Sequence, residues 1–268
     1  MTIDSSYVNA YDISGIQQNS LEKIGSALAI NKASDDASGL AIGSALGVEK
    51  SSLSQAVENM NSGIAMSNIA QGGLAEQKNI LQDIKTETLK AMNGTMSESD
   101  RDIIANQINK YIEQYDNIAN STTYNGNALL KTDGTSSDDI SIVDKESTID
   151  MEKSDTLSIS DSLKTLMSDF STNPNSRATL LDTLDQSINQ IGSFQSDFGS
   201  AANAMEASAR NSISMETQTA AAQSTIMDID YSKEVSSFSK TNLLSQIGLV
   251  MQSQANAIQG RNISLLSH

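Results

Sequence analysis

The chain has 268 residues, a formal net charge of −16 at pH 7, no cysteine and no tryptophan, and 4% of its residues are aromatic. The negative charge disfavours nucleic acid and anionic membrane surfaces as partners, because their phosphates would repel it, and the lack of cysteine excludes disulfides and thiolate metal sites. With few large rings to fill a compact core and a single proline, Pro174, the composition favours long helices that pack side by side.

The first residues carry neither the basic segment nor the apolar run of a signal peptide, and no apolar stretch is long enough to span a bilayer. We therefore expect a protein that stays in the cytosol or is exported by a route without a cleaved signal.

Residues 1–28 are predicted to form an amphipathic helix, which residues 28–39 interrupt. The apolar positions of this helix include Leu21, Ile24 and Leu28. The interruption contains four turn or cap formers, which predict a non-helical connector: Asn31, Asp35, Asp36 and Gly39.

From residue 40 to Asn93 a helical apolar pattern runs without proline, which predicts one helix about 80 Å long at 1.5 Å per residue. Asn93-Gly94 is a stop signal, and Ser97–Asp100 has the composition of a helix N-terminus. A second helix, antiparallel to the first, is predicted from a heptad pattern. That pattern passes through Ile104, Ile108, Tyr111, Tyr115 and Ile118.

Residues 121–162 change character, because a turn signal at 124–127 is followed by alternation of apolar and polar residues in 139–143 and 147–151. We predict short strands or hairpins there, with 132–139 as a loop. Helices are then predicted over 161–170, from Asn173-Pro174 to about 225, and from about 232 to 260, with Asp228–Asp230 as a joint. The predicted fold is mainly α: an elongated antiparallel helical bundle or coiled coil with a small β-hairpin region near the middle of the chain.

Helical patterning reaches close to both ends of the chain, although termini usually fray. At the C-terminal end it includes Val235, Phe238, Leu243, Ile247, Val250 and Ile258. We therefore expect the two ends to pair, with each other or with copies of the chain.

Catalytic chemistry finds little support in the sequence. The one histidine, His268, is the last residue, and the adjacent pairs Asp35/Asp36 and Asp138/Asp139 fit capping or solvation better than catalysis. Asp228 and Asp230 lack the spacing of a calcium loop. We predict no enzyme, no cofactor and no metal site.

Five segments, in order along the chain, resemble bacterial flagellin. They are LAINKASDDASGLAI at 28–42, NSGIA with QGGL in 61–74, TYNGN at 123–127, IMDIDYSKEV at 226–235, and QSQAN with ISLL in 252–266. Each is weak alone, but their joint occurrence at both ends is specific.

The resemblance implies a structural subunit of the flagellar filament, exported unfolded by the type III apparatus, polymerised through its terminal helices and located outside the cell. It implies an inner coiled coil from residues 1–39 and 226–268, an outer helical rod from 40–121 and 174–225, and an exposed hairpin region at 122–173. It also implies a homo-oligomer, an export chaperone and a filament cap as partners, and no large outer domains.

Several departures from the family pattern, among them Ala29 and Ser34 at connector positions that are basic in the family, fit a minor or divergent flagellin. The alternatives are a secreted flagellin paralogue or a hook–filament junction protein that acts by binding a partner, and a coiled-coil receptor fragment. The segment equivalent to the flagellin epitope of a Toll-like receptor lacks its arginines, so we expect weak or no activation. Its residues here include Gln82, Asp83, Lys85 and Glu87.

Overall fold

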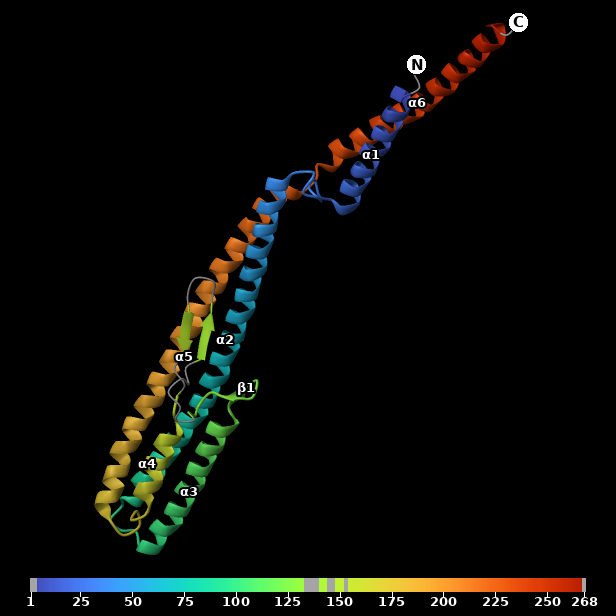
Figure 1. The fold of residues 1–268 in the computed structure, drawn as a ribbon. Helices are drawn as coiled ribbons and strands as arrows, with labels where there is room; N and C mark the ends of the chain where they lie inside the picture. The colour runs from blue at the N-terminus through green and yellow to red at the C-terminus, as the bar shows by residue number, and fades with distance from the viewer. Residues whose placement is uncertain (1–3, 133–139, 144–147, 152–153, 267–268) are drawn as a thin grey trace. The chain divides into compact units, whose positions relative to one another are not determined.

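Within the residues that the computed structural model describes (4–132, 140–143, 148–151 and 154–266), six helices and two small antiparallel hairpins make up the regular structure (Figure 1). The helices are α1 (Asp4–Ser26), α2 (Ala37–Ala91), α3 (Glu98–Ser121), α4 (Leu157–Met167), α5 (Pro174–Met227) and α6 (Tyr231–Leu266). The strands are β1 (Thr123–Tyr124), β2 (Asn127–Ala128), β3 (Ile140–Val143) and β4 (Thr148–Met151). The mainly α fold with small hairpins mid-chain is confirmed.

The chain divides into two compact units. Residues 52–215 form one, and residues 1–51 with 216–268 form the other, so that α2 and α5 each contribute to both. We call them the middle unit and the terminal unit.

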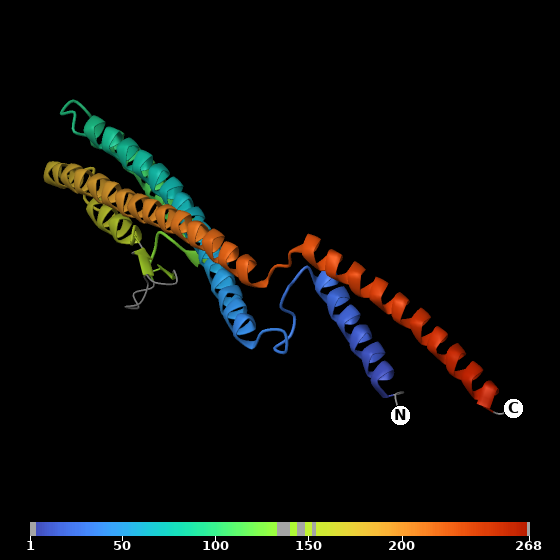
Figure 2. The same ribbon diagram turned by 90° about the horizontal axis from the view of Figure 1, so that it is seen from above.

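The core of the middle unit is built on seven-residue repeats. In α2 the buried positions alternate in steps of three and four along the whole length of the unit, which is the spacing of coiled-coil helices. They are Leu53, Ala56, Met60, Gly63, Ser67, Ala70, Leu74, Gln77, Leu81, Ile84, Thr88 and Ala91. Helix α5 lies alongside with a matching series, and α3 and α4 complete the bundle (Figures 1 and 2). The buried members of α5 are Arg177, Leu180, Leu184, Ser187, Ile191, Phe198, Ala201, Met205, Ala209 and Ser212.

The buried stripe of α3 differs from the predicted heptad. Ile112 and Ala119 are buried, whereas the predicted Tyr111 and Ile118 are half-buried. Because α3 packs against α4 as well as facing α2, its buried stripe is wider than a two-helix seam.

Small residues in α2 make room for the segments that cross it. A Cβ added at Gly63 would lie 2.3 Å from Met205 Sδ and 3.0 Å from Ile142 Cγ1 of β3. Further along the helix, Ser67 Oγ donates to Met151 Sδ of β4 at 3.1 Å. The β3–β4 hairpin therefore packs on a part of α2 where side chains are short.

Two arginines close the turns at one end of the bundle. Arg101 Nε donates to the carbonyl oxygen of Ala91 at 3.1 Å, across the α2–α3 turn. Buried Arg177 Nη1 donates to the carbonyl oxygens of Phe170 at 2.6 Å and Ser171 at 3.2 Å, between α4 and α5. Charged donors thus satisfy backbone carbonyls at these chain reversals.

Local signals produce the predicted helix start and turn. Ser97 Oγ accepts from the Asp100 backbone N–H at 3.2 Å, and Asp100 Oδ2 accepts from the Ser97 N–H at 3.1 Å, which forms a capping box for α3. Asn125 and Gly126 have φ values of 49° and 83°, as a two-residue hairpin turn requires. The predicted loop at 132–139 lies almost entirely outside the described residues.

Candidate assembly site

The two ends of the chain pair within the terminal unit. Helices α1 and α6 pack antiparallel, with the N- and C-termini pointing the same way from the joint (Figures 1 and 2). Their remaining surfaces, which face solvent in the single chain, make up the candidate assembly site.

Most of the apolar residues predicted to form the terminal seam are exposed in the single chain. Ile24, Leu28 and Phe238 are half-buried, and Val235 is 36% exposed. Five others are more than half exposed: Leu21, Leu243, Ile247, Val250 and Ile258. One partner helix therefore covers only a narrow side of α6.

Three residues of α6 outside the predicted seam are exposed as well, and so is Ile16, which belongs to the apolar pattern of the N-terminal helix. Leu244, Leu249 and Met251 are 59%, 61% and 66% exposed, and Ile16 of α1 is 54% exposed. For Leu249 and Met251 the signal was the run of residues without a polar side chain from Ile247 to Met251, because such a run puts apolar groups on several sides of a helix. This part of α6 therefore exposes apolar groups on more than one side.

The joint between the helices is held by a short antiparallel bridge. Leu28 pairs with Asp228; the Ala29 N–H donates to Met227 O at 2.6 Å, and the Ile229 N–H donates to Ala27 O at 3.1 Å. Ala27 ends α1 with φ of 59°, a left-handed conformation that costs a non-glycine residue about 1 kcal/mol. Contacts across 200 residues of sequence thus fix the start of the connector.

The connector residues predicted from the sequence lie together. Asp35 Oδ2 accepts from the N–H groups of Asn31 and Lys32, both at 3.0 Å, and these two bonds lower the pKa of Asp35. Asp36 Oδ1 accepts from the Gly39 N–H at 2.9 Å, so it caps the first turn of α2. Lys32 also forms an ion pair with Glu22 of α1.

Gly39 allows a close approach in this packing. A Cβ there would lie 2.5 Å from both Ile30 Cδ1 and Asp36 Oδ2, and Ile30 is buried. The connector therefore folds down onto the first turn of α2.

The acidic residues considered for chemistry take part in local hydrogen bonds. Asp228 Oδ2 accepts from Ser224 Oγ, and Asp230 Oδ1 accepts from the Lys233 N–H at 3.1 Å in the first turn of α6. The described residues hold no group of three or more potential metal ligands, and no described helix is long and apolar enough to cross a membrane. Asp138 and Asp139 lie outside the described residues.

The receptor-epitope equivalent lies on α2 in the middle unit. Gln82 and Asp83 are exposed. Lys85 forms an ion pair with Asp185 of α5, and Glu87 Oε1 accepts from Lys90 Nζ at 2.7 Å. Two of the four side chains are therefore held by partners within the chain.

A helical core of seven-residue repeats, joined to a terminal helix pair with open apolar sides, defines a structural protein that packs against other helices. The family profiles for the bacterial flagellin N-terminal and C-terminal helical regions match residues 9–135 and 181–266. A flagellin of Halalkalibacterium halodurans is 29% identical over 261 residues, covering 93% of each chain. A flagellin of Bacillus subtilis is 30% identical over 272 residues, covering 89% of each.

Among solved structures, the crystal structure of Bacillus cereus flagellin aligns with a TM-score of 0.51 at 24% identity, covering 58% of this chain and 88% of that one. This likeness supports the fold. The chain belongs to the bacterial flagellin family, as its terminal motifs predicted. It is a structural subunit of the extracellular flagellar filament.

Proposed function

We propose that this subunit polymerises through α1 and α6, whose open apolar sides are buried against the same helices of neighbouring copies. The observation that carries the proposal is the exposure of Leu243, Ile247, Leu249 and Val250, which lies between 54% and 61% in the single chain. In this scheme residues 1–39 and 226–268 form the inner coiled coil, 40–121 and 174–225 the outer rod, and 122–173 the outward-facing region.

The size of the effect makes single residues testable. Full burial of a leucine or valine side chain is worth about 1.5–3 kcal/mol, so burying one that is already partly covered is worth about 1–2 kcal/mol. A charge placed there costs more, because it must be desolvated or must keep the neighbour away. One such substitution should weaken subunit addition by roughly a hundredfold or more.

We also propose how the subunit reaches the filament. The subunit leaves the cell unfolded through the flagellar type III apparatus, with an export chaperone on the way and a filament cap at the growing tip. The absence of cysteine supports this route, since no disulfide can form before the chain has been threaded.

The polymerisation proposal is tested by comparing Val250→Asp with Ile103→Asp. Both replace an exposed aliphatic residue by aspartate, at 60% and 67% exposure, but Ile103 lies on α3 in the middle unit. Purified monomers are added to filament seeds, and growth is followed by sedimentation and electron microscopy. We expect Ile103→Asp to elongate the seeds and Val250→Asp to remain in the supernatant.

Elongation by Val250→Asp at the wild-type rate would contradict assembly through α6. Failure of the wild-type chain itself to add to seeds would favour a secreted paralogue or junction protein that acts by binding a partner.

We further propose that the subunit activates the Toll-like flagellin receptor weakly or not at all. The ion pair between Lys85 and Asp185 supports this, because it engages the positive charge of the epitope equivalent within the chain. Asp83 adds an exposed negative charge beside it. In a reporter-cell assay the wild-type response should stay far below that of a typical enterobacterial flagellin. The double variant Asp83→Arg/Lys85→Arg should raise it, and a full response by the wild-type chain would refute the proposal.

A further inference from the structure

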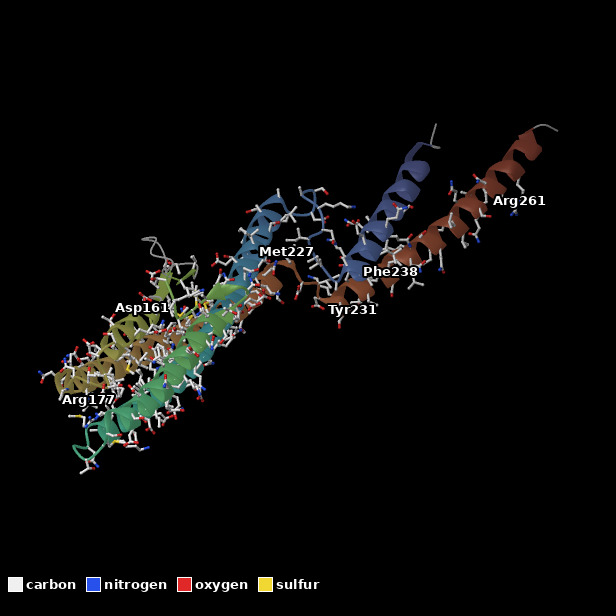
Figure 3. All side chains as sticks on the ribbon, turned by 90° about the horizontal axis from the view of Figure 1, so that it is seen from below. Asp161, Arg177, Met227, Tyr231, Phe238 and Arg261 are labelled. Carbon is white, nitrogen blue, oxygen red and sulfur yellow. The ribbon has the colours of Figure 1, made fainter. Side chains whose placement is uncertain are left out.

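Met227, the last residue of α5, sits at the joint of the terminal unit, just before Tyr231 begins α6 (Figure 3). Its side chain lies against the backbone of α2 at Gly43. A Cβ at Gly43 would lie 2.2 Å from Met227 Sδ and 2.6 Å from its Cγ. The glycine thus forms a notch that holds the thioether and has no room for an additional atom.

The same residue also holds the connector through its backbone. Met227 O accepts the 2.6 Å hydrogen bond from the Ala29 N–H, and the next two residues pair with Leu28 and Ala27. A displacement of the Met227 side chain from the notch therefore disturbs the bridge directly.

Met227 borders a space that can admit a small solute. Met227 is half-buried and lines a cavity of about 340 Å³ in the terminal unit. The other residues of the lining are Leu28, Lys50, Ala220, Gln223, Ser224 and Asp228. Met60 and Met205 in the middle unit, by contrast, have no exposed surface.

We propose that Met227 is an oxidation site at which a peroxide opens the joint. The Sδ lone pair attacks one peroxide oxygen and the O–O bond breaks. The second oxygen leaves as hydroxide and takes the proton of the oxygen now bound to sulfur, so the products are water and the sulfoxide, with sulfur oxidised by two electrons.

The sulfoxide oxygen is a strong acceptor that needs more room than the notch offers, since a Cβ at Gly43 would already lie 2.2 Å from Met227 Sδ. Gln223 Nε2 uses one of its two hydrogens to donate to Gly43 O at 3.0 Å. On the cavity side, the Lys50 ammonium can donate to the new oxygen. The oxidised side chain is therefore drawn away from Gly43 towards the cavity, and the 27–29/227–229 bridge opens.

The first test is the order of oxidation in the full-length monomer, measured by peptide mass spectrometry during a hydrogen peroxide time course. Met251 and Met92, at 66% and 44% exposure, serve as exposed references, and Met60 and Met205 as buried ones. We expect Met227 to react within about tenfold of the exposed pair and roughly a hundredfold faster than the buried pair. Oxidation of Met227 as slow as that of the buried pair would overturn the proposal.

The second test measures amide hydrogen exchange at Ala29 and Ile229. After peroxide treatment their exchange should rise roughly tenfold in the wild-type chain and stay unchanged in Met227→Leu, which keeps the volume but has no sulfur. Met227→Gln, which places a polar amide in the notch, should raise exchange without peroxide. An equal rise in treated Met227→Leu would show that other methionines open the joint.

Gly43→Ala keeps the test independent of how Met227 variants fold. The added Cβ expels the thioether from the notch, so the variant should exchange faster at Ala29 before any oxidation, and Met227 should oxidise faster than in the wild-type chain. Unchanged exchange and unchanged oxidation in Gly43→Ala would show that the notch does not hold the joint.

Discussion

The replacement Thr156→Val tests a buried polar junction in the middle unit. Thr156 has no exposed surface and lies just before α4. Its Oγ1 donates to Leu130 O at 2.8 Å and accepts from Gln77 Nε2 at 3.0 Å, and Gln77 Nε2 also donates to Tyr115 O at 3.3 Å. One hydroxyl therefore links α2, the segment after β2 and the start of α4.

Valine matches the shape of threonine, so the substitution removes the hydrogen bonds with little change in volume. Two bonds at about 0.5–1.5 kcal/mol each are lost. The Gln77 amide then keeps only its long bond to Tyr115, and an incompletely satisfied buried amide costs about 1 kcal/mol or more. We expect the free energy of unfolding of the middle unit to fall by about 2–4 kcal/mol.

The matched control is Thr165→Val on the exposed side of α4. Thr165 Oγ1 donates to Asp161 O at 2.9 Å within the same helix, where water can replace it, so we expect a change of about 0.5 kcal/mol or less. Urea unfolding followed by near-ultraviolet tyrosine circular dichroism reports on the middle unit through buried Tyr115. Equal midpoints for the two variants would refute the idea that this junction contributes more than a surface hydroxyl.

Three further predictions use other local features. Backbone hydrogen bonds lower the pKa of Asp35 in the folded chain, so its charge contributes to the stability of the connector above its unfolded pKa of about 3.9. This contribution is lost as pH falls through the lower folded pKa. Amide hydrogen exchange in the connector should therefore speed up in that acid range, and the acceleration should be smaller in Asp35→Asn. Ser97→Ala removes the N-terminal cap of α3 and should lower the free energy of unfolding, measured in urea, by about 1 kcal/mol. An unchanged free energy would show that the cap does not stabilise the helix. Gly63→Ala should lower the free energy of unfolding by about 1–3 kcal/mol, because its Cβ would lie 2.3 Å from Met205 Sδ. Gly72→Ala, whose Cβ has no atom within 4 Å, should instead stabilise α2 by about 0.5–1 kcal/mol. Changes of the same sign in the two variants would refute the packing argument.

The helices were predictable because their periodicity is local. The long helix predicted over 40–93 is observed as Ala37–Ala91, and the helix predicted to open at Asn173-Pro174 begins at Pro174. A seven-residue apolar repeat within one segment predicts which side of its helix is buried, without knowledge of the partner helix. The start of α3 was equally local, since its capping box lies within Ser97–Asp100.

Polar residues inside the repeat were not predictable in the same way. Ser67 is a polar residue within the apolar pattern of α2, yet it is buried and its hydroxyl donates to Met151, 84 residues away. Gln77 is likewise buried, with a partner in Thr156, 79 residues away. A buried polar side chain is stable only with such partners, and the pattern of one helix says nothing about them.

The connector was predicted as a break in the helix, but the way it is held was not. Turn formers at Asn31, Asp35 and Asp36 indicated a local fold, which the structure shows. Ala27 carried no sign of a left-handed conformation, because alanine favours helix. Its conformation follows from the bridge to residues 227–229, a contact between the two ends of the chain.

The two units use the same aliphatic side chains and differ in how many neighbours each helix has. In the middle unit, leucines such as Leu74 and Leu81 on α2 have no exposed surface, because other helices and a hairpin surround that stretch of α2. Leu243 and Leu249 of α6 are 58% and 61% exposed, because within the described part of the chain α1 is the helix that packs along α6. We expect the middle unit to be stable by itself. Under the proposed assembly through α1 and α6, binding of further copies to the folded pair would shift its folding equilibrium by mass action and so couple the order of the terminal helices to polymerisation.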